Sequence, residues 1–293
     1  MRYDLHNHST ASDGTLAPAE LVAHLAACRV DVMALADHDT TAGVAEAAAA
    51  AARLGLGFVP GVEVSVAWRG QVVHVLGLGV DPEERTLRTG LERLQAERAE
   101  RGRRMGRRLE RAGVPGAYEA ARRLAGGGPP GRSHFARALV ERGLARDAQE
   151  AFRRFLKRGR PGYVAGRWAA LEEAVAWIRA SGGAAVLAHP LRYGLSGGAL
   201  ERLVEAFRGA GGEALEVVSG PTPPEQAERL ARLAARHGLA GTVGSDFHGP
   251  GASPGDPARL PGLPASCRPL WGSRGWAAPA RSGAVAAAAA GAG

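Results

Sequence analysis

The histidines of this chain are concentrated in short segments that also contain carboxylates. Of nine histidines, five lie in four such segments: DLHNHS from Asp4 to Ser9, ADHDT from Ala36 to Thr40, AHP from Ala188 to Pro190, and GSDFH from Gly244 to His248. Each segment lies at or just after an apolar run of the kind that forms a buried strand. Because an α/β barrel aims its strand ends at one mouth, we expect these side chains to converge.

Three further residues extend this set. Asp13 stands in the segment SDG, Glu63 in PGVEVS and His74 in VVHVLG. Considered alone, each residue has a structural explanation that does not involve metal. A histidine in an apolar strand is commonly a core residue, and Asp-Gly is commonly a turn. Together with the four segments they give six imidazoles and three carboxylates, enough for more than one divalent metal ion with positions left for water.

The spacing within two of the segments favours chelation. Side chains along a strand repeat with period two, so a strand would place His6 and His8 on one face, and would do the same for Asp246 and His248. Imidazole and carboxylate without thiolate suit Mn²⁺, Fe²⁺ or Zn²⁺. Two such ions can activate water and stabilise the attacking and leaving oxygens of a phosphoester. These residues therefore predict a multinuclear hydrolase.

Strands and helices alternate around the segments. Before residue 81 we expect strands over 3–8, 30–36, 58–68 and 71–80, and helices over 18–27 and 41–54. After residue 168 we expect strands over 184–189, 214–218 and 241–247, and helices over 170–180, 199–210 and 224–237. This pattern predicts an α/β barrel made of two parts of the chain, 1–80 and 168–272.

The segment between the two parts has a different pattern. Residues 83–111 read as a long, charged helix, and further helices are expected near 133–142 and 147–156, after the loop GGGPPG. Residues 81–167 are therefore predicted to be a helical insertion. At the other end of the chain, 273–293 is rich in alanine and glycine, and we expect a disordered tail there.

The composition narrows the class of protein. A chain of 293 residues with 45% hydrophobic content can bury a full core, as a barrel with an insertion requires. The formal charge of +8 would favour a polyanion, but Lys157 is the only lysine, and a compositional bias toward arginine explains the charge equally well. Cys28 and Cys267 are the only cysteines and lie far apart, so neither a disulfide framework nor a thiolate zinc site is indicated.

The N-terminal region enters the first predicted strand at once, as MRYDLHNHS, without the pattern of a signal peptide. No apolar run approaches the length needed to span a membrane. We therefore expect a cytoplasmic protein without membrane association, and nothing in the sequence indicates an obligatory protein partner.

Taken in order, the segments resemble the metal-binding motifs of the PHP superfamily, the polymerase and histidinol phosphatase domain. The resemblance rests on DLHNHS followed by SDG, then ADHDT, GVEVS, the histidine in VVHVLGLG, AHP and GSDFH. It implies an α/β fold, a distorted (β/α)7 barrel with metal ions at the carboxyl ends of its strands and a helical insertion capping the mouth. The insertion, with RSHFARAL and RGRPGYV, is similar to the branch that holds 3′,5′-nucleoside bisphosphate phosphatases and 5′-to-3′ exoribonucleases.

Residue by residue, the resemblance implies three metal ions, with Mn²⁺ expected and Fe²⁺ or Zn²⁺ as alternatives. The implied ligands are His6, His8, Glu63 and Asp246 for the first ion, Glu63 as a bridge with His74 and His189 for the second, and Asp13, His38 and His248 for the third. The attacking group would be a hydroxide held by metal near Glu63 and Asp246.

Four residues near the ligand segments are not expected to bind metal themselves. Ser9 and Cys28 lack the sequence context of a covalent nucleophile, which agrees with attack by hydroxide. Asp37 or Asp39, on either side of His38, would orient ligands from outside, as metal-bound imidazoles usually require.

The insertion supplies candidate substrate contacts. Arg132 and His134 in GRSHFAR, and Lys157 and Arg160 in FLKRGRPGYV, resemble positions where this branch presents basic groups to a substrate phosphate. Arginine offers a bidentate fork for that anion. The alternative for all four residues is that they are solvated surface charges. For Lys157 and Arg160 this alternative is as well supported as substrate binding. His134 has a further alternative, as a metal ligand that reaches down from the insertion.

Four functions are compatible with these observations. The leading hypothesis is a metal-dependent phosphoesterase that removes the 3′-phosphate of nucleoside 3′,5′-bisphosphates, or trims short 5′-phosphorylated RNA by the same scission. A small-metabolite phosphatase of the histidinol phosphate type is the second, and the long insertion argues against it. A non-catalytic, metal-binding accessory domain of a polymerase is disfavoured by the complete ligand set. A nucleic-acid-binding module rests on charge alone.

Overall fold

The computed structural model describes residues 1–252, 255–273 and 276. Its first part alternates strand and helix, as the sequence predicts. The elements are β1 Tyr3–Asp4, α1 Pro18–Ala27, β2 Val32–Leu35, α2 Val44–Leu54, and the long hairpin of β3 Gly57–Trp68 and β4 Gln71–Leu78. Strands β1, β2 and β3 pair in parallel, so their carboxyl ends meet at one edge of the sheet.

Local sequence accounts for the boundaries of these elements. Helix α1 has Pro18 at its first position, where a missing N–H group costs no helical hydrogen bond. Helix α2 ends at Gly55, whose φ of 66° is in the left-handed region that glycine adopts readily. Arg69 and Gly70 have φ values of 47° and 79°, the pattern of a two-residue turn that joins β3 to β4.

The second part of the sheet closes most of a barrel. Its elements are β5 Ala169–Ala170, α7 Leu171–Ala180, β6 Ala184–Leu187, α8 Gly197–Gly209, β7 Ala214–Ser219, α9 Pro224–Arg236 and β8 Ala240–Gly244. The strands lie in the order β1-β2-β3-β4-β6-β7-β8, and β5 pairs with β3 at the side. The backbone N–H of Leu5 donates to the carbonyl of Val243 at 3.0 Å, which brings β8 back to β1.

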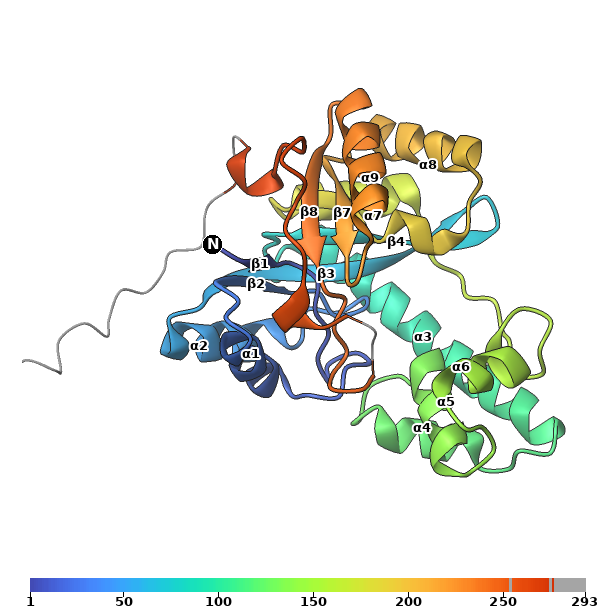
Figure 1. Cartoon of the computed structure of the whole chain (residues 1–293). Helices are drawn as coiled ribbons and strands as arrows, with labels where there is room; N and C mark the ends of the chain where they lie inside the picture. Colours follow the sequence, from blue (N-terminus) through green and yellow to red (C-terminus); the bar gives the residue numbers. More distant parts are fainter. Residues whose placement is uncertain (253–254, 274–275, 277–293) are drawn as a thin grey trace, which may run out of the picture.

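One strand distorts this barrel. β4 runs antiparallel to both of its neighbours, β3 and β6, whereas the other pairs along the path are parallel. Helices α1 and α2 lie on one side of the sheet and α7, α8 and α9 on the other (Figure 1). The predicted α/β barrel, distorted and with seven strands along its path, is confirmed.

The chain between β4 and β5 is helical. It contains α3 Arg85–Arg111, α4 Ala117–Leu124, α5 Arg132–Glu141 and α6 Ala148–Ala151, which continues into a π-helical turn, η1 Phe152–Leu156. Figure 1 shows α4, α5 and α6 standing off from the sheet around the distal half of α3. They enclose a hydrophobic core of their own, which includes Met105, Leu109, Phe135, Leu139 and Leu156.

The first turns of α3 belong to the barrel instead. Leu87, Leu91 and Leu94 pack in the core that β3, β4 and α7 also form. Gly90 lies against Trp177 so closely that a Cβ atom there would come within 2.6 Å of the ring. One helix therefore joins the barrel core to the core of the helical unit.

Several predicted strands end earlier than expected, and for β1 and β8 this concerns pairs of candidate ligands. β1 covers only Tyr3–Asp4 and β8 stops at Gly244, so His6, His8, Asp246 and His248 lie beyond regular strand. The period of two along a strand is therefore the wrong reason for their convergence. Asn7 still forms a parallel bridge with Phe247, which holds the two segments side by side.

Two further expectations concern the chain ends and membranes. The tail expected over 273–293 lies outside the described residues, apart from positions 273 and 276. Among the residues that the structure describes, no helix combines the length and the apolar character needed to cross a bilayer.

Candidate metal centre and active site

The structure brings the nine candidate ligands together at the carboxyl edge of the barrel. Seven of them follow the ends of strands: His6, His8 and Asp13 after β1, His38 after β2, His189 after β6, and Asp246 and His248 after β8. Glu63 and His74 come from within β3 and β4, because this hairpin extends past the end of β2. Their potential ligand atoms form four groups, each with all atoms within 4.8 Å of one another.

Glu63 lies at the centre of this cluster and is fully buried. Its Oε1 atom is 2.9 Å from Nδ1 of His74 and 2.9 Å from Nε2 of His189. Its Oε2 atom is 2.8 Å from Nδ1 of His38 and 3.4 Å from Nε2 of His6. One carboxylate therefore faces imidazoles from four different segments of the chain.

Asp246 connects the segments that follow the first and the last strand of the barrel, β1 and β8. Its Oδ1 atom lies 3.1 Å from Nε2 of His8 and 3.5 Å from Nε2 of His6. The same oxygen lies 3.6 Å from Nδ1 of His248. Its other oxygen, Oδ2, forms an ion pair with Arg192. The residue has a φ of 53°, a backbone conformation that is uncommon for residues other than glycine and clusters at functional sites.

Asp13 forms the third centre of the cluster. Its Oδ1 atom is 3.3 Å from Nε2 of His248 and 3.9 Å from Nε2 of His38. Burial alone would lower the pKa of His248, but Asp13 and then Asp246 raise it to about 10. The hydroxyl of Ser133 on α5 donates to Oδ2 of Asp13 at 2.7 Å. The helical unit thus contacts a candidate metal ligand directly.

The buried atoms of the cluster fit metal ions. Nε2 of His6, Nδ1 of His38, Oε2 of Glu63 and Oδ1 of Asp13 are buried, and although they lie close to other cluster atoms, none of them makes a hydrogen bond of acceptable geometry among the described residues. Such orphaned atoms are costly in a protein interior unless something else binds them. Because all four are imidazole or carboxylate atoms that point toward one another, the set has the donor chemistry of a divalent metal centre.

The carboxylates of the cluster are held in their charged form by the imidazoles around them. Burial by itself would raise the pKa of Glu63, but His74 and the other nearby imidazoles hold that pKa well below its usual range. The same balance, with His6 as the strongest partner, lowers the pKa of Asp246. Burial opposes the charged form of His6, yet Glu216 and the other carboxylates raise its pKa well above the ordinary value. The carboxylates are therefore ionised at neutral pH.

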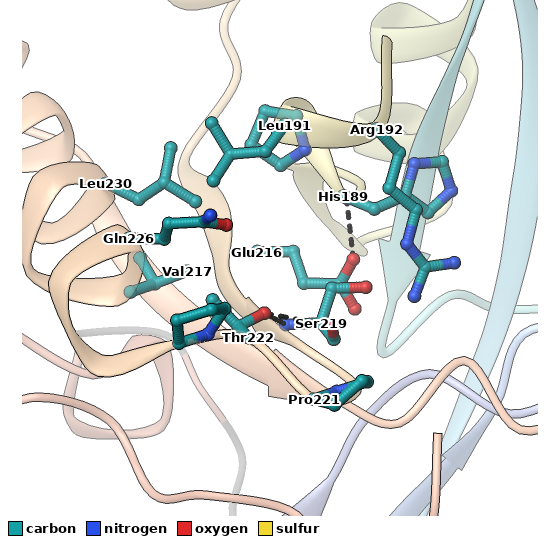
Figure 2. Close-up of a pocket in the computed structure, with 12 residues that line it drawn as sticks. His189, Leu191, Arg192, Glu216, Val217, Ser219, Pro221, Thr222, Gln226 and Leu230 are labelled. Atoms are coloured by element: carbon teal, nitrogen blue, oxygen red, sulfur yellow. Dashed lines mark hydrogen bonds between the residues drawn. The ribbon is translucent and has the colours of Figure 1, made fainter. Parts of the chain in front are cut away.

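Glu216 supports the cluster from outside and was missed by the sequence analysis. It lies in β7, fully buried, with Oε1 2.9 Å from Nδ1 of His6. Its Oε2 atom accepts the backbone N–H of His189 at 2.6 Å (Figure 2). Behind it is a cavity of about 230 Å³ between α9 and the 3₁₀ turn η2 Pro190–Tyr193. An acid inside an apolar strand, ALEVVS, was the available signal, because a buried carboxylate needs partners.

Other buried groups hold the loops of the site. Asp37 accepts the backbone N–H of Ser9 at 2.8 Å and two serine hydroxyls, and burial raises its pKa to about 6. Asp39 accepts the backbone N–H of Ser65 at 2.6 Å and pairs with Arg98. The hydroxyl of Tyr193 accepts the backbone N–H of His74 at 2.8 Å. Both aspartates that flank His38 thus organise backbone near the ligands.

Three arginines line a small cavity beside the cluster. Arg98, Arg101 and Arg132 surround a space of about 110 Å³ that also touches His38 and His74. Burial, followed by repulsion from Arg132 and Arg98, lowers the pKa of Arg101 to about 9. Close guanidinium groups in a buried space are stabilised when an anion joins them. We call this space the arginine cavity.

The predicted substrate residues differ in their positions. Arg132 lines the arginine cavity. His134 is buried, and its Nδ1 atom accepts the backbone N–H of Gly131 at 3.0 Å instead of facing the cluster groups. Lys157 and Arg160 are exposed and are not among the residues that line the cavity. Arg98 and Arg101 were not singled out from the sequence, because they stand in a helix crowded with similar charges.

Comparison with known proteins places this site in a family. The family model described as the PHP domain matches residues 4–161, more than half of the chain. The chain belongs to the PHP domain family. This PHP chain is 47% identical over 269 residues to a 3′,5′-nucleoside bisphosphate phosphatase of Chromobacterium violaceum, covering 92% of this chain and 94% of that protein.

Two further relatives extend the comparison. The chain is 45% identical over 250 residues to the 5′-3′ exoribonuclease Rnm of Salmonella typhimurium, covering 85% of each protein. A structure assigned as a metal-dependent phosphoesterase of Bifidobacterium adolescentis matches with a TM-score of 0.78 at 30% identity, covering 92% of this chain and 93% of that one. This PHP protein is therefore a hydrolase of the metal-dependent phosphoesterase class.

Proposed function

We propose that this protein hydrolyses the 3′-phosphate of nucleoside 3′,5′-bisphosphates and trims short 5′-phosphorylated RNA from its 5′ end. The observation that carries the proposal is the arginine cavity beside the ligand cluster. A substrate with two phosphates would place one phosphate at the cluster and the other among the guanidinium groups. Histidinol phosphate, a monoester, has no second phosphate for the arginine cavity. The named activities of two relatives support the same substrate class.

The nine ligands would hold three divalent ions, and Mn²⁺ is the ion that we propose. His6, His8 and Asp246 would share the first ion with Glu63, and Glu63 would share the second with His74 and His189. The third would be held by Asp13, His38 and His248. Bound ions of this type activate water and neutralise charge on a phosphate. The position of Glu63 between imidazoles of all three sets supports its role as a bridge.

The proposed reaction adds water across the bond between phosphorus and the 3′ oxygen. The hydroxyl of the water joins phosphorus and the remaining proton goes to the 3′ oxygen, so a bisphosphate gives a nucleoside 5′-monophosphate and inorganic phosphate. In RNA the same bond joins the first nucleoside to the next phosphate. Its hydrolysis releases a nucleoside 5′-monophosphate and leaves a shorter RNA with a new 5′-phosphate.

The arginines would hold the phosphate that is not attacked. Arg98 is fixed by Asp39 at 2.5 Å and by the hydroxyl of Ser65 at 2.9 Å. Arg101 donates to the carbonyl of Val164 at 2.8 Å. Because these donors are already ordered, binding costs little further side-chain entropy and positions the substrate for reaction.

One comparison of substrates tests the proposal. Manganese-loaded protein is incubated with adenosine 3′,5′-bisphosphate, with histidinol phosphate and with a 5′-phosphorylated oligoribonucleotide. We expect AMP and inorganic phosphate from the first, little product from the second, and nucleoside 5′-monophosphates from the third. Preferred hydrolysis of histidinol phosphate would contradict the proposal, and absence of hydrolysis from all three would indicate a non-catalytic role.

A further inference from the structure

A second and larger cavity also opens at the ligand cluster. It has a volume of about 630 Å³ and lies between α5, α6 and η1 of the helical unit and the loop that follows β8. Asp13, Asp246, His248 and Arg192 form its inner end, so it begins at the cluster itself. This volume is within the range of small-molecule sites and far exceeds what one phosphate group requires. We call this cavity the groove.

The wall of the groove offers both apolar surface and positive charge. Ala136, Val140, Phe152 and Pro250 supply the apolar part. Arg137 on α5 supplies charge, and its Nη1 atom is buried without a hydrogen-bond partner among the described residues. A guanidinium nitrogen without a partner is costly, and an anion in the groove beside Arg137 would supply the missing acceptor.

Phe152 stands at the boundary of the two cavities. It lines both the groove and the arginine cavity, and the guanidinium of Arg132 lies 5.9 Å from its ring centroid. It is the first residue of the π-helical turn η1, a backbone form that is often found at functional sites. An aromatic ring between two charged cavities suits the stacking of a nucleobase between two phosphates.

We propose that the groove binds the part of an RNA substrate that lies beyond the scissile phosphate, with Arg137 on the next phosphate along the strand. The inference rests on the proposed function, which places the terminal 5′-phosphate in the arginine cavity. A nucleoside bisphosphate ends at the attacked phosphate and would leave the groove unused. An RNA continues past that point and needs such a path. The groove thus distinguishes a polymer from a mononucleotide.

The acidic residues of the groove do not oppose this inference. Asp147 is occupied as the cap of α6, where its side chain accepts the backbone N–H of Glu150 at 2.7 Å. Glu141 is exposed to solvent. Asp13 and Asp246 belong to the ligand cluster at the inner end of the groove, and Asp246 is paired with Arg192. Arg137 is the arginine that α5 contributes to the groove.

The test compares two substrates in two variants. Arg137→Ala removes the proposed phosphate contact, and Arg142→Ala removes an exposed arginine at the end of the same helix. For each protein kcat/KM is measured with adenosine 3′,5′-bisphosphate and with a 5′-phosphorylated tetra-adenylate. We expect Arg137→Ala to lower the tetranucleotide value by about tenfold to a hundredfold, as loss of one charge-assisted contact does, and to leave the bisphosphate value within about twofold. Arg142→Ala should change neither value.

The outcomes separate this inference from the proposed function. No loss with the tetranucleotide in Arg137→Ala would overturn the role of Arg137. A wild-type protein that hydrolyses the bisphosphate but no oligonucleotide would also overturn it and leave the phosphatase proposal standing. Should Arg137→Ala lose both activities, Arg137→Lys decides, because it keeps the charged stem without the guanidinium fork. A loss confined to the tetranucleotide in that variant supports the groove, and an unselective result excludes it.

Discussion

The Nδ1 atom of His6 lies 2.9 Å from Oε1 of Glu216, while Nε2 of the same ring faces the ligand cluster. An imidazole presents to a metal the nitrogen that its outer partner leaves free. Glu216 therefore selects the nitrogen of His6 that a metal ion can use. Its second oxygen holds the backbone of His189, so one buried carboxylate positions two candidate ligands.

We expect Glu216→Gln to weaken metal binding by about 10- to 100-fold, the usual effect of losing an outer partner of a ligand. The amide keeps an acceptor for the backbone of His189, so the fold should persist. Competition with a chelator of known affinity measures the change. Glu213→Gln, at an exposed position just before β7, is the matched control. Equal affinities in the two variants would refute the role of Glu216.

Protein purified without chelator should contain more than one equivalent of transition metal by elemental analysis. The physical reason is the number of buried imidazole and carboxylate atoms that lack partners. Removal of metal should abolish activity and lower the melting temperature, and added Mn²⁺ should restore both, because a ligand that binds the native state stabilises it. Metal-free protein that added Mn²⁺ does not activate would contradict the metal centre.

Glu63→Gln should reduce turnover more completely than His248→Ala. Both oxygens of Glu63 contact imidazoles of the cluster, whereas His248 faces Asp13 and Asp246 at its edge. Loss of a bridging carboxylate would disturb two ions, and loss of a terminal imidazole only one. Metal content and kcat/KM are measured for both variants. Small and equal losses would argue against a bridging role.

Arg132→Ala should discriminate between substrates. We expect kcat/KM for adenosine 3′,5′-bisphosphate to fall about tenfold to a hundredfold, the effect of one charge-assisted contact, and the value for an aryl phosphate to change little. Arg160→Ala is the comparison, since its exposed side chain lies outside the arginine cavity. Metal content should stay the same in both variants. Equal losses on both substrates would place Arg132 in the metal site.

The stability of the protein should depend on pH through His134. Burial lowers the pKa of His134 to about 4, from 6.5 in a model peptide. Between these values the unfolded chain binds more protons than the native protein, so stability is lost as the pH falls. From pH 7 to pH 5 the free energy of unfolding should drop by about 1 to 2 kcal/mol more in the wild type than in His134→Asn.

Comparison of the wild type with the asparagine variant controls for the other titrating groups. It retains a side-chain acceptor for the N–H of Gly131 but does not titrate. Because both proteins share every other titrating group, the difference between their urea midpoints isolates His134. Parallel pH profiles would show that its native pKa is not lowered.

The barrel and its ligand positions could be predicted because they depend on local patterns. The helix expected over 18–27 has the observed bounds, since Pro18 and a periodic apolar face define it. The ligands follow apolar strands, and a barrel brings all such ends to one mouth. The short extent of β1 and β8 could not be predicted, because a strand ends where its pairing with a neighbouring strand ends, and the residues of one strand do not show this.

The remaining parts of the site depend on geometry that no local pattern contains. Arg98 and Arg101 differ from the other arginines of α3 because they lie on the face of the helix that lines the arginine cavity. The sequence does not show which face that is. Arg137 lines the groove together with residues of the loop after β8, which lie over one hundred residues away in the sequence. Glu216 was recognisable as an acid within an apolar strand, but the sequence could not identify the two ligands that it positions.

The antiparallel course of β4 determines how far α3 has to extend. Because β4 ends at the far side of the barrel, α3 must travel its height before the helical unit can reach the mouth. Its 27 residues correspond to about 40 Å, and its side chains serve the barrel core, the arginine cavity and the distal core in turn.

One inserted residue between Leu94 and Arg101 would rotate everything beyond it by about 100° and advance it by about 1.5 Å, removing Arg101 from the cavity. Length changes can therefore accumulate in the glycine loop at 126–128 but not in this stretch of α3. The number of residues in this stretch of α3 therefore fixes the position of Arg101 relative to the barrel core.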